Sequence, residues 1–391
     1  MGDHPRHKEI IPTFLIIPYL CVPSPPVEGK GEDNNPMKDL PPSIDLLLSM
    51  AVKHHASDLL IVEGVNPTAR ISGKLVSIIN HKLSSADTRL LAAEIADDKI
   101  MSEFEARKAI DFCFERPGIG RFRCDLHLQR GSVAIAIRIF PKELPSLEQL
   151  HLPPVLRKFC EMSKGLVLLT GPTGCGKSTT LAALVDIINR ERNVHIITIE
   201  DPIEYLHENK NCIVEQIEVG KDTTSFSSAL RHALRQDPNV ILVGEMRDLE
   251  TISIALTAAE TGHLIFSTLH TSDAAQTVDR IIDVFPENQQ SQIRHQLALS
   301  LAGIVSQHLI PALDGAGRIP AVEILIANDA IRNLIRQGKN YQTYSHIVMG
   351  RKEGMVTLEE SLAQLYKEKK ISYEDALFRS VYKEEFEKSL K

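Results

Sequence analysis

Gly-Pro-Thr-Gly-Cys-Gly-Lys-Ser-Thr-Thr occupies residues 171–180 and contains the spacing Gly-x-x-x-x-Gly-Lys-Ser. The apolar run before it, residues 166–169, is short enough for a buried strand. After it, apolar residues recur with the period of an amphipathic helix, at Leu181, Leu184, Val185 and Ile188. A strand, a glycine loop and a helix N-terminus surround a polyphosphate with backbone N–H groups and a positive helix end. This stretch therefore predicts a nucleoside triphosphate site rather than a chance glycine-rich turn.

Residue types within the loop suggest individual roles. In this pattern the lysine reaches the β- and γ-phosphates and the next hydroxyl ligates Mg²⁺, so we expect these roles for Lys177 and Ser178. The expected cofactors are ATP and Mg²⁺. The candidate nucleotide-binding residues are Gly171, Pro172, Thr173, Gly174, Cys175, Gly176, Lys177, Ser178 and Thr179.

Composition limits the classes of partner. The 391 residues carry 44 Lys and Arg against 51 Asp and Glu, a formal net charge of −7. A nucleic-acid motor usually shows a basic stripe and aromatic stacking platforms, whereas this chain is acidic and has no tryptophan. We therefore expect no nucleic acid partner, although a local basic patch would fit within an acidic total.

The six cysteines contain no Cys-x-x-Cys pair, so neither a zinc knuckle nor a redox motif is indicated. Cys175 lies inside the phosphate loop, where a free thiol suits a reducing compartment. Cysteine usage therefore favours a cytoplasmic protein.

The first 38 residues differ from the rest of the chain. Residues 10–22 are mostly apolar and follow Arg6 and Lys8, but the run is too short to span a bilayer. One interpretation is a signal peptide, but no Ala-x-Ala-type cleavage site follows the run. We favour a disordered leader over 1–38, or a start codon placed upstream of the native one at Met37.

A small α+β domain is expected over residues 39–140. Ser43 is a helix N-cap, 59–62 and 70–76 read as paired strands, and 86–95 reads as a helix. Apolar and polar residues alternate strictly over 121–128, and the pattern resumes after a turn. This predicts an antiparallel hairpin with one solvent-exposed face. Residues 141–154 contain four prolines and read as a linker.

Residues 155–391 show a different pattern. Apolar runs without alternation occur at 166–169, 195–199, 240–243 and 264–269, and helical patterns lie between them. Strands that are buried on both faces and interleaved with helices predict a parallel sheet, and therefore an α/β fold. Beyond about residue 341 the pattern is helical.

Acidic and histidine-containing segments follow these strands. Glu200, Asp201 and Glu204 come just after one strand, and Glu245 ends another, with Gly244 where such motifs usually carry the first aspartate. Carboxylates at strand ends can orient water or face a metal, although a solvated acidic loop is the simpler alternative. The spacing of His263 and His270 does not suggest a structural zinc site. We expect His270 to sense phosphate or to hydrogen-bond across the site.

In order and spacing, the segments 171–179, 200–204, 243–248 and 262–270 resemble the motifs of secretion-type ATPases. The resemblance extends over about residues 37–379 and includes 56–59 and 120–123 in the small domain. Residues 330–336, Ala-Ile-Arg-Asn-Leu-Ile-Arg, are similar to the C-terminal signature of the pilus retraction branch of that family. Residues 1–36 lie outside the resemblance.

The resemblance implies a RecA-like P-loop ATPase domain with a parallel-rich sheet, preceded by a smaller PAS-like α+β domain. It implies a homohexamer, docked peripherally at the cytoplasmic face of the inner membrane on a pilus platform protein. Glu204 would be the catalytic carboxylate, Glu245 the Walker B acid near Mg²⁺, and His270 part of the box that couples subunits. The arginines expected to reach the triphosphate are Arg121, Arg123 and Arg138. For any one of them, a charged and solvated sheet face is the alternative.

The expected function is ATP-driven pilus retraction. An assembly or type II secretion ATPase is an alternative, but such relatives typically carry a longer N-terminal region and a tetracysteine zinc insertion, which this chain lacks. A second alternative is an accessory ATPase that sits in the ring of a paralogous partner without driving movement. Intact Lys177, Glu204 and Glu245 favour a working motor.

Overall fold

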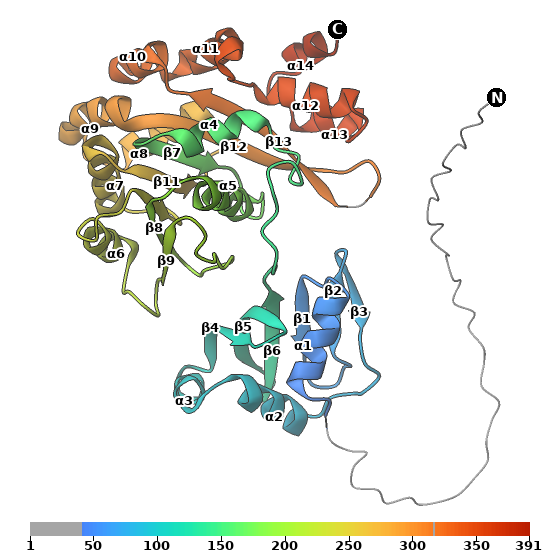
Figure 1. Cartoon of the computed structure of the whole chain (residues 1–391). Coiled ribbons are helices and arrows are strands. Elements are labelled where there is room, and N and C mark those ends of the chain that lie inside the picture. Colours follow the sequence, from blue (N-terminus) through green and yellow to red (C-terminus); the bar gives the residue numbers. More distant parts are fainter. Residues whose placement is uncertain (1–40, 316) are drawn as a thin grey trace, which may run out of the picture. The chain divides into compact units, whose positions relative to one another are not determined.

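Two β-sheets organise the part of the chain that the structure, a computed structural model, describes: residues 41–315 and 317–391. The leader expected over 1–38 lies outside these residues, as do the first two residues of the domain expected over 39–140. Strands from the first part of the chain form one sheet and strands from the second part form the other (Figure 1). The expected linker, 141–154, separates the two sets along the sequence, and its exact limits stay a prediction.

The first sheet has six antiparallel strands in the order β3-β2-β1-β6-β5-β4. Its strands are β1 (Asp58–Ile61), β2 (Thr68–Ile71), β3 (Lys74–Ser77), β4 (Ala109–Arg116), β5 (Gly120–Gln129) and β6 (Ser132–Ile139). The helices α1 (Ile44–Lys53), α2 (Ser85–Ile95) and α3 (Asp98–Arg107) bury apolar side chains against it in one core. Ser43 caps α1 as predicted, because its side chain accepts from the Leu46 backbone N–H.

Two details of this region differ from the sequence-based expectation. The prediction of a single strand over 70–76 is wrong. Ser72 and Gly73 have positive φ and turn the chain, so this stretch is divided between β2 and β3. The alternation of β5 predicts that Leu128 shares the buried face with Phe122, but Leu128 lies near the end of the strand and is exposed. The hairpin of β5 and β6 is confirmed, and its turn at Arg130 and Gly131 also has positive φ.

The second sheet has seven strands in the order β13-β12-β7-β11-β10-β8-β9. It is parallel except for the antiparallel pair β12 and β13. Its strands are β7 (Gly165–Thr170), β8 (His195–Glu200), β9 (Ile213–Glu218), β10 (Val240–Val243), β11 (Leu264–Leu269), β12 (Leu301–Pro311) and β13 (Arg318–Ile326). The four apolar runs predicted as strands are therefore β7, β8, β10 and β11, and the α/β class is confirmed.

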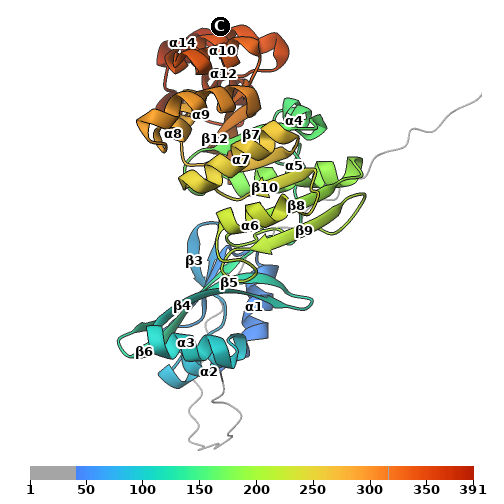
Figure 2. The ribbon, with the colours of Figure 1, turned by 90° about the vertical axis from the view of Figure 1, so that its left-hand side faces the viewer.

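Helices cover both faces of this sheet, so its central strands are apolar at most positions. In β7, Val167 and Leu169 pack with α4 and α5, whereas Leu166 and Leu168 pack in the core that includes α6 to α9. Figure 2 shows the same layers after a 90° turn. These helices are α4 (Arg157–Glu161), α5 (Lys177–Glu191), α6 (Phe226–Ala233), α7 (Leu249–Thr261), α8 (Ala274–Asp283) and α9 (Glu287–Ser300). Burial on both sides leaves mainly the strand ends and their loops for polar groups.

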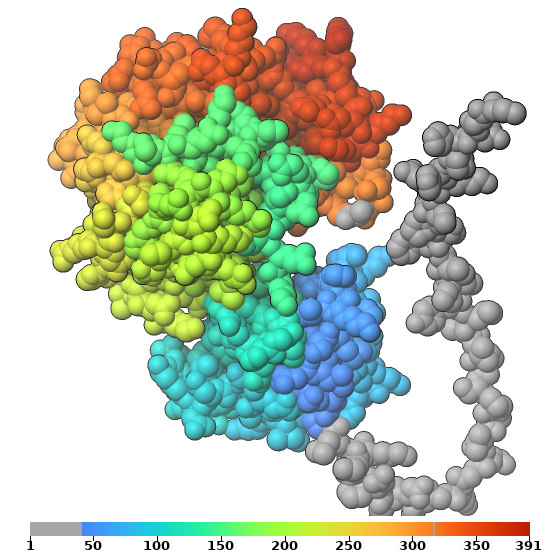
Figure 3. All heavy atoms as spheres, viewed as in Figure 1, coloured from blue at the N-terminus to red at the C-terminus, as the bar shows by residue number. Residues whose placement is uncertain are grey.

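The chain ends in a group of helices beyond β13, as predicted, and both ribbon views show them together (Figures 1 and 2). They are α10 (Asp329–Gln337), α11 (Thr343–Met349), α12 (Leu358–Lys367), α13 (Tyr373–Arg379) and α14 (Lys383–Leu390). The green segment that follows the linker lies beside them (Figure 3), where Lys158 Nζ donates to the Glu353 carbonyl at 2.8 Å. Within residues 41–391, residue 316 aside, none of the helices has the length and apolarity needed to cross a membrane.

Candidate functional site

The phosphate loop, residues 171–176, connects β7 to α5 at the carboxyl end of the strand. Gly174 and Gly176 have φ of +76° and +89°, a region that side chains other than glycine rarely adopt. A Cβ on Gly171 would come within 2.3 Å of the Gln307 carbonyl oxygen and 2.7 Å of the Cys175 sulfur. Glycine is therefore required in this loop for backbone shape and for close approach.

Lys177 is the first residue of α5, and its side chain folds back onto the loop. The residue is 8% exposed, and its Nζ donates to the carbonyls of Gly171 at 2.8 Å and Pro172 at 3.1 Å. Burial lowers the pKa of the ammonium, and the nearby carboxylates of Glu245 and Glu204 oppose that shift. Within the described residues it forms no ion pair, so an incoming polyphosphate would supply its missing counter-charge.

Ser178 fits the expected role of a magnesium ligand. Its side chain is exposed at the N-terminus of α5, and no hydrogen bond to it is found among the described residues. A free hydroxyl beside a phosphate loop is the oxygen ligand that Mg²⁺ takes together with phosphate oxygens.

Glu245 follows β10 and is held between two basic groups. Its side chain is 17% exposed, and one carboxylate oxygen accepts from Arg247 Nε and lies 3.3 Å from His270 Nε2. The loop is fixed from β11, because Ser267 Oγ donates to the Val243 carbonyl and Thr268 Oγ1 to the Gly244 carbonyl, both at 2.7 Å. The histidine box and the acid at the tip of β10 therefore form one bonded unit.

Glu204 differs from Glu245 because the described residues give its carboxylate neither a hydrogen bond nor an ion pair. Its neighbour Tyr205 is buried, and the phenol oxygen lies 3.0 Å from Thr179 Oγ1 in the first turn of α5. Gln216 on β9 donates to the Tyr205 carbonyl at 2.9 Å and accepts from the His207 backbone N–H at 2.8 Å. These bonds hold the backbone on one side of Glu204 while its carboxylate stays available for water.

Another carboxyl group, that of Glu200, lies at the end of β8. It accepts from Thr198 Oγ1 at 2.6 Å and from Gln216 Nε2 at 3.2 Å. Burial raises the pKa of Glu200 to about 7, against the effect of both hydrogen bonds. Glu200 is therefore held inside the fold, whereas Glu204 remains unpaired and within electrostatic range of Lys177.

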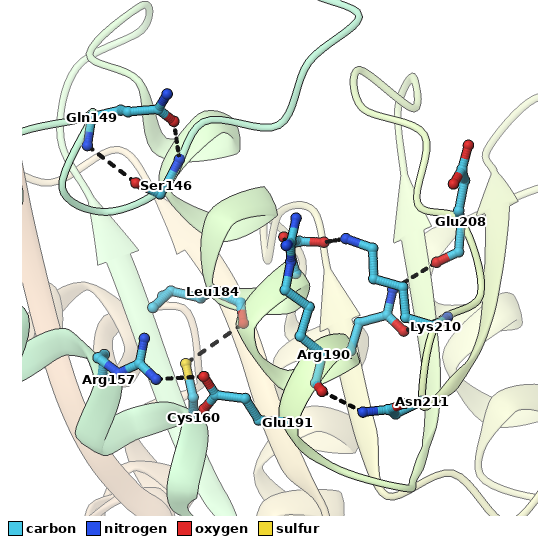
Figure 4. A network of polar contacts seen from close by, with 12 residues as sticks. Ser146, Gln149, Arg157, Cys160, Leu184, Arg190, Glu191, Glu208, Lys210 and Asn211 are labelled. Carbon is cyan, nitrogen blue, oxygen red and sulfur yellow. Dashed lines mark hydrogen bonds and ion pairs between the residues drawn. The ribbon is translucent and has the colours of Figure 1, made fainter.

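The far end of α5 is tied to the same loop (Figure 4). Lys210 forms an ion pair with Asp186, and Asn189 Nδ2 donates to the Glu208 carbonyl at 2.7 Å. Figure 4 also shows Asn211 bonded to the Arg190 carbonyl. Because Thr179 contacts Tyr205 near its start, α5 is joined to residues 205–211 at both ends.

The three candidate arginines lie in β5 and β6 of the first sheet. Arg123 and Arg138 face each other across the two strands, and each pairs with an acid of the same sheet, Asp111 and Asp58. Arg121 is 11% exposed and pairs with Glu115, but it also reaches the second sheet. It pairs there with Glu218, and its Nε donates to the Ile203 carbonyl at 3.1 Å.

The two histidines of the segment 262–270, His263 and His270, lie in different surroundings. His263 Nδ1 lies 3.0 Å from the Ala258 carbonyl at the end of α7, a helix-end contact away from the carboxylates. His270 lies beside Glu245, as described above. Across residues 41–315 and 317–391, no cluster of three His, Cys, Asp or Glu side chains could hold a metal by itself.

Sequence reasoning did not single out the polar groups behind the phosphate loop. Ser306, Gln307 and His308 are consecutive, buried residues in the otherwise apolar β12. Their bonds reach the phosphate loop and the segment after the histidine box. Three polar residues within a buried apolar strand are unusual, and that pattern is the signal that could have identified them.

Residues 35–378 match the protein family described as type II/IV secretion system protein. The chain is 46% identical over 340 residues to the type IV pilus retraction ATPase PilT of Pseudomonas aeruginosa, across 87% of this chain and 98% of the relative. It is 40% identical over 331 residues to the type IV pilus ATPase PilU of the same organism, across 85% of this chain and 87% of the relative.

The fold agrees with solved structures. The crystal structure of the pilus retraction motor PilT with bound ADP has a TM-score of 0.83 and 47% identity. The match covers 89% of this chain and all of that one. The similarity therefore includes both sheets as well as the phosphate loop.

Proposed function

The chain belongs to the type II/IV secretion system protein family, and we propose that it is an ATP-hydrolysing motor that powers retraction of type IV pili. The observation that carries the proposal is the grouping of Lys177, Glu204 and Glu245 beside a formed phosphate loop. Similarity to PilT over nearly the whole length supports the pilus assignment, and the ADP in the PilT structure supports the nucleotide.

Each residue has a role that its surroundings allow. Backbone N–H groups of 171–176 and the Lys177 ammonium bind the phosphates, and the lysine exchanges its two carbonyl partners for phosphate oxygens. The free carboxylate of Glu204 orients the attacking water and accepts its proton. Glu245, held by Arg247 and His270, presents negative charge toward the site of the bound cation.

Mg²⁺, when bound, would neutralise charge on the phosphate oxygens, and the Ser178 hydroxyl would be one of its ligands. Glu245 would face the same ion, directly or through water. Its side chain lies within electrostatic range of Lys177, which fits a single shared site for phosphates and cation.

We further propose that the protein acts as a homohexamer, docked peripherally on the cytoplasmic side of the inner membrane. Its partners would be the pilus platform protein and a paralogous ATPase. The similarity to both PilT and PilU supports a pair of related ATPases in one system. Of the three candidate arginines, we propose that Arg121 is the one that acts at the nucleotide site, because it bonds to Glu218 and to the Ile203 carbonyl beside Glu204. Arg123 and Arg138 instead pair with acids of their own sheet.

Deleting the gene in its source organism tests the function. A retraction motor predicts excess surface pili and loss of twitching motility, because assembly continues without disassembly. Bald cells would instead indicate an assembly ATPase and would overturn the proposal.

ATP turnover by the purified protein tests whether it is an enzyme, and the deletion separates a motor from an accessory subunit. We expect turnover that disappears in Lys177→Ala. If the deletion leaves retraction intact while a paralogue drives it, the accessory alternative is correct.

A further inference from the structure

Three consecutive buried residues of β12 bond to the end of β7, to the phosphate loop and to the segment after β11. Ser306 accepts from Thr170 at the end of β7 at 2.9 Å, and His308 Nε2 lies 3.1 Å from the Ser272 carbonyl after β11. Gln307, between them, points to the opposite face of the sheet, where the phosphate loop passes into α5. β12 thus bonds to β7, to the phosphate loop and to the segment that follows β11.

Gln307 makes two hydrogen bonds to the phosphate loop and α5. Its Nε2 donates to the Cys175 carbonyl at 2.6 Å, and its Oε1 accepts from Thr180 Oγ1 at 2.9 Å. The residue is 2% exposed, so water does not compete for either bond. The carbonyl acceptor requires an N–H donor, which fixes the orientation of the amide.

Gln307 also leaves no room for a side chain at two glycines of the loop. Its carbonyl oxygen lies so close to Gly171 that a Cβ there would approach to 2.3 Å, and its Nε2 would lie 2.9 Å from a Cβ on Gly176. One residue therefore borders the loop at its first glycine, at Cys175 and at its last glycine. No other described residue outside 170–180 donates a hydrogen bond to a backbone carbonyl of the loop.

We propose that Gln307 is the positioning residue of the phosphate loop: it holds the loop in the shape that binds the triphosphate. With the Cys175 carbonyl turned toward Gln307, the following N–H groups stay free for phosphate oxygens. This inference rests on the proposed function only in taking a nucleoside triphosphate as the ligand. Gln307 touches no reacting atom, so it acts through the loop.

Gln307→Leu removes both bonds, and Gln307→Glu, when its carboxylate is ionised, keeps the acceptor for Thr180 while it removes the donor to Cys175. Thr180→Val removes only the hydroxyl. We expect the dissociation constant for a fluorescent ATP analogue to rise about tenfold or more in both Gln307 variants, a change of about 1.4 kcal/mol. A smaller rise is expected for Thr180→Val.

Thr88→Val is the matched control. Thr88 is a fully buried helical threonine in α2, bonded to the Ser85 carbonyl, and it lies in the first sheet's core region. We expect the control and the Thr180 variant to have similar melting temperatures without nucleotide, and only the Thr180 variant to bind the analogue more weakly. In steady-state assays KM for ATP should rise more than kcat falls, as for a binding loop that is less well ordered.

Wild-type affinity in Gln307→Leu would overturn the proposal. So would a loss of affinity that is matched by an equal loss in the Thr88→Val control, because Gln307 would then act only through general stability. Failure of the proposed function gives different results, namely no ATP turnover by the wild-type protein or bald cells after deletion of the gene. The binding measurement does not need turnover, so it tests Gln307 in either case.

Discussion

The two sheets present their charged groups in different ways. In the first sheet, Arg123 and Arg138 lie on the open face of neighbouring strands, and each pairs with a carboxylate of the same sheet. In the second sheet the central strands are buried on both faces, and the candidate nucleotide-site groups lie at the strand ends and at the start of α5. Those loops are held by hydrogen bonds from buried residues of other strands, such as Gln307 and Thr268.

This difference predicts how substitutions act. Ion pairs on an open face are screened by water and contribute little individually. A buried polar group that loses its partner costs much more, and the loop that it holds then changes shape. Substitutions around the second sheet should therefore affect nucleotide chemistry strongly, whereas most of those on the first sheet should not.

Lys177→Ala should have the largest effect. It removes the cation that would meet the phosphates, so we expect ATP turnover to fall below detection and binding of an ATP analogue to be lost. Lys339→Ala, a change in an exposed lysine after α10, is the control and should behave as wild type. Near-normal turnover in Lys177→Ala would refute the site assignment.

Glu204→Gln should come second. The amide keeps the shape of the side chain but cannot accept a proton, so we expect hydrolysis to slow by about 10²- to 10⁴-fold while ATP still binds. Single-turnover hydrolysis and analogue binding measure the two effects separately. Loss of binding in this variant would mean that Glu204 has a structural role instead.

Arg121→Ala and Arg138→Ala test the first sheet directly. Arg121 bonds to Glu218 and the Ile203 carbonyl beside Glu204, so we expect turnover to fall by about 10- to 100-fold. Arg138 is 66% exposed, and we expect its variant to stay within about fivefold of wild type. If Arg138→Ala abolishes turnover, the open face of the first sheet contributes directly to catalysis and the contrast between the sheets fails.

Glu323→Gln should have the smallest effect on ATP turnover, because it acts on stability alone. Burial raises the pKa of Glu323 from its ordinary 4.5 to about 7, and the carboxylates of Asp273 and Glu359 add to the rise, against the Ala274 N–H bond. The folded protein therefore holds a proton between about pH 4.5 and 7 that the unfolded chain releases. Wild-type stability should fall as the pH rises through that window.

The amide in the Glu323→Gln variant cannot ionise, so the variant should escape this loss. At pH 8 we expect its free energy of unfolding to exceed that of wild type by at most about 3 kcal/mol. At pH 5, where Glu323 is protonated, the two proteins should unfold at similar temperatures. Thermal unfolding at both pH values measures the difference, and an equal difference at pH 5 and pH 8 would contradict the prediction.

Much of the second sheet was predictable from sequence because its signals are local. The strand before the phosphate loop and the helix after it both follow from patterns within about ten residues. The split of 70–76 into two strands was missed because Ser72, rather than a glycine or asparagine, adopts the first positive φ of the turn.

The supporting bonds of the site could not be predicted in the same way. Gln307 meets Cys175 across 132 positions of sequence, and Gln216 reaches Glu200 and Tyr205 from a neighbouring strand. Such contacts depend on strand order, and a single sequence does not reveal that β12 lies beside β7. The pairing of Arg121 with Glu218 was missed for the same reason.

The double attachment of α5 has a mechanical consequence. Its 15 residues span about 22 Å, and both ends are fastened to the segment that follows Glu204. A helix held in this way behaves as a stiff rod rather than a hinge. If the first turn of α5 holds phosphate as proposed, a displacement there would move residues 205–211 instead of being absorbed by bending.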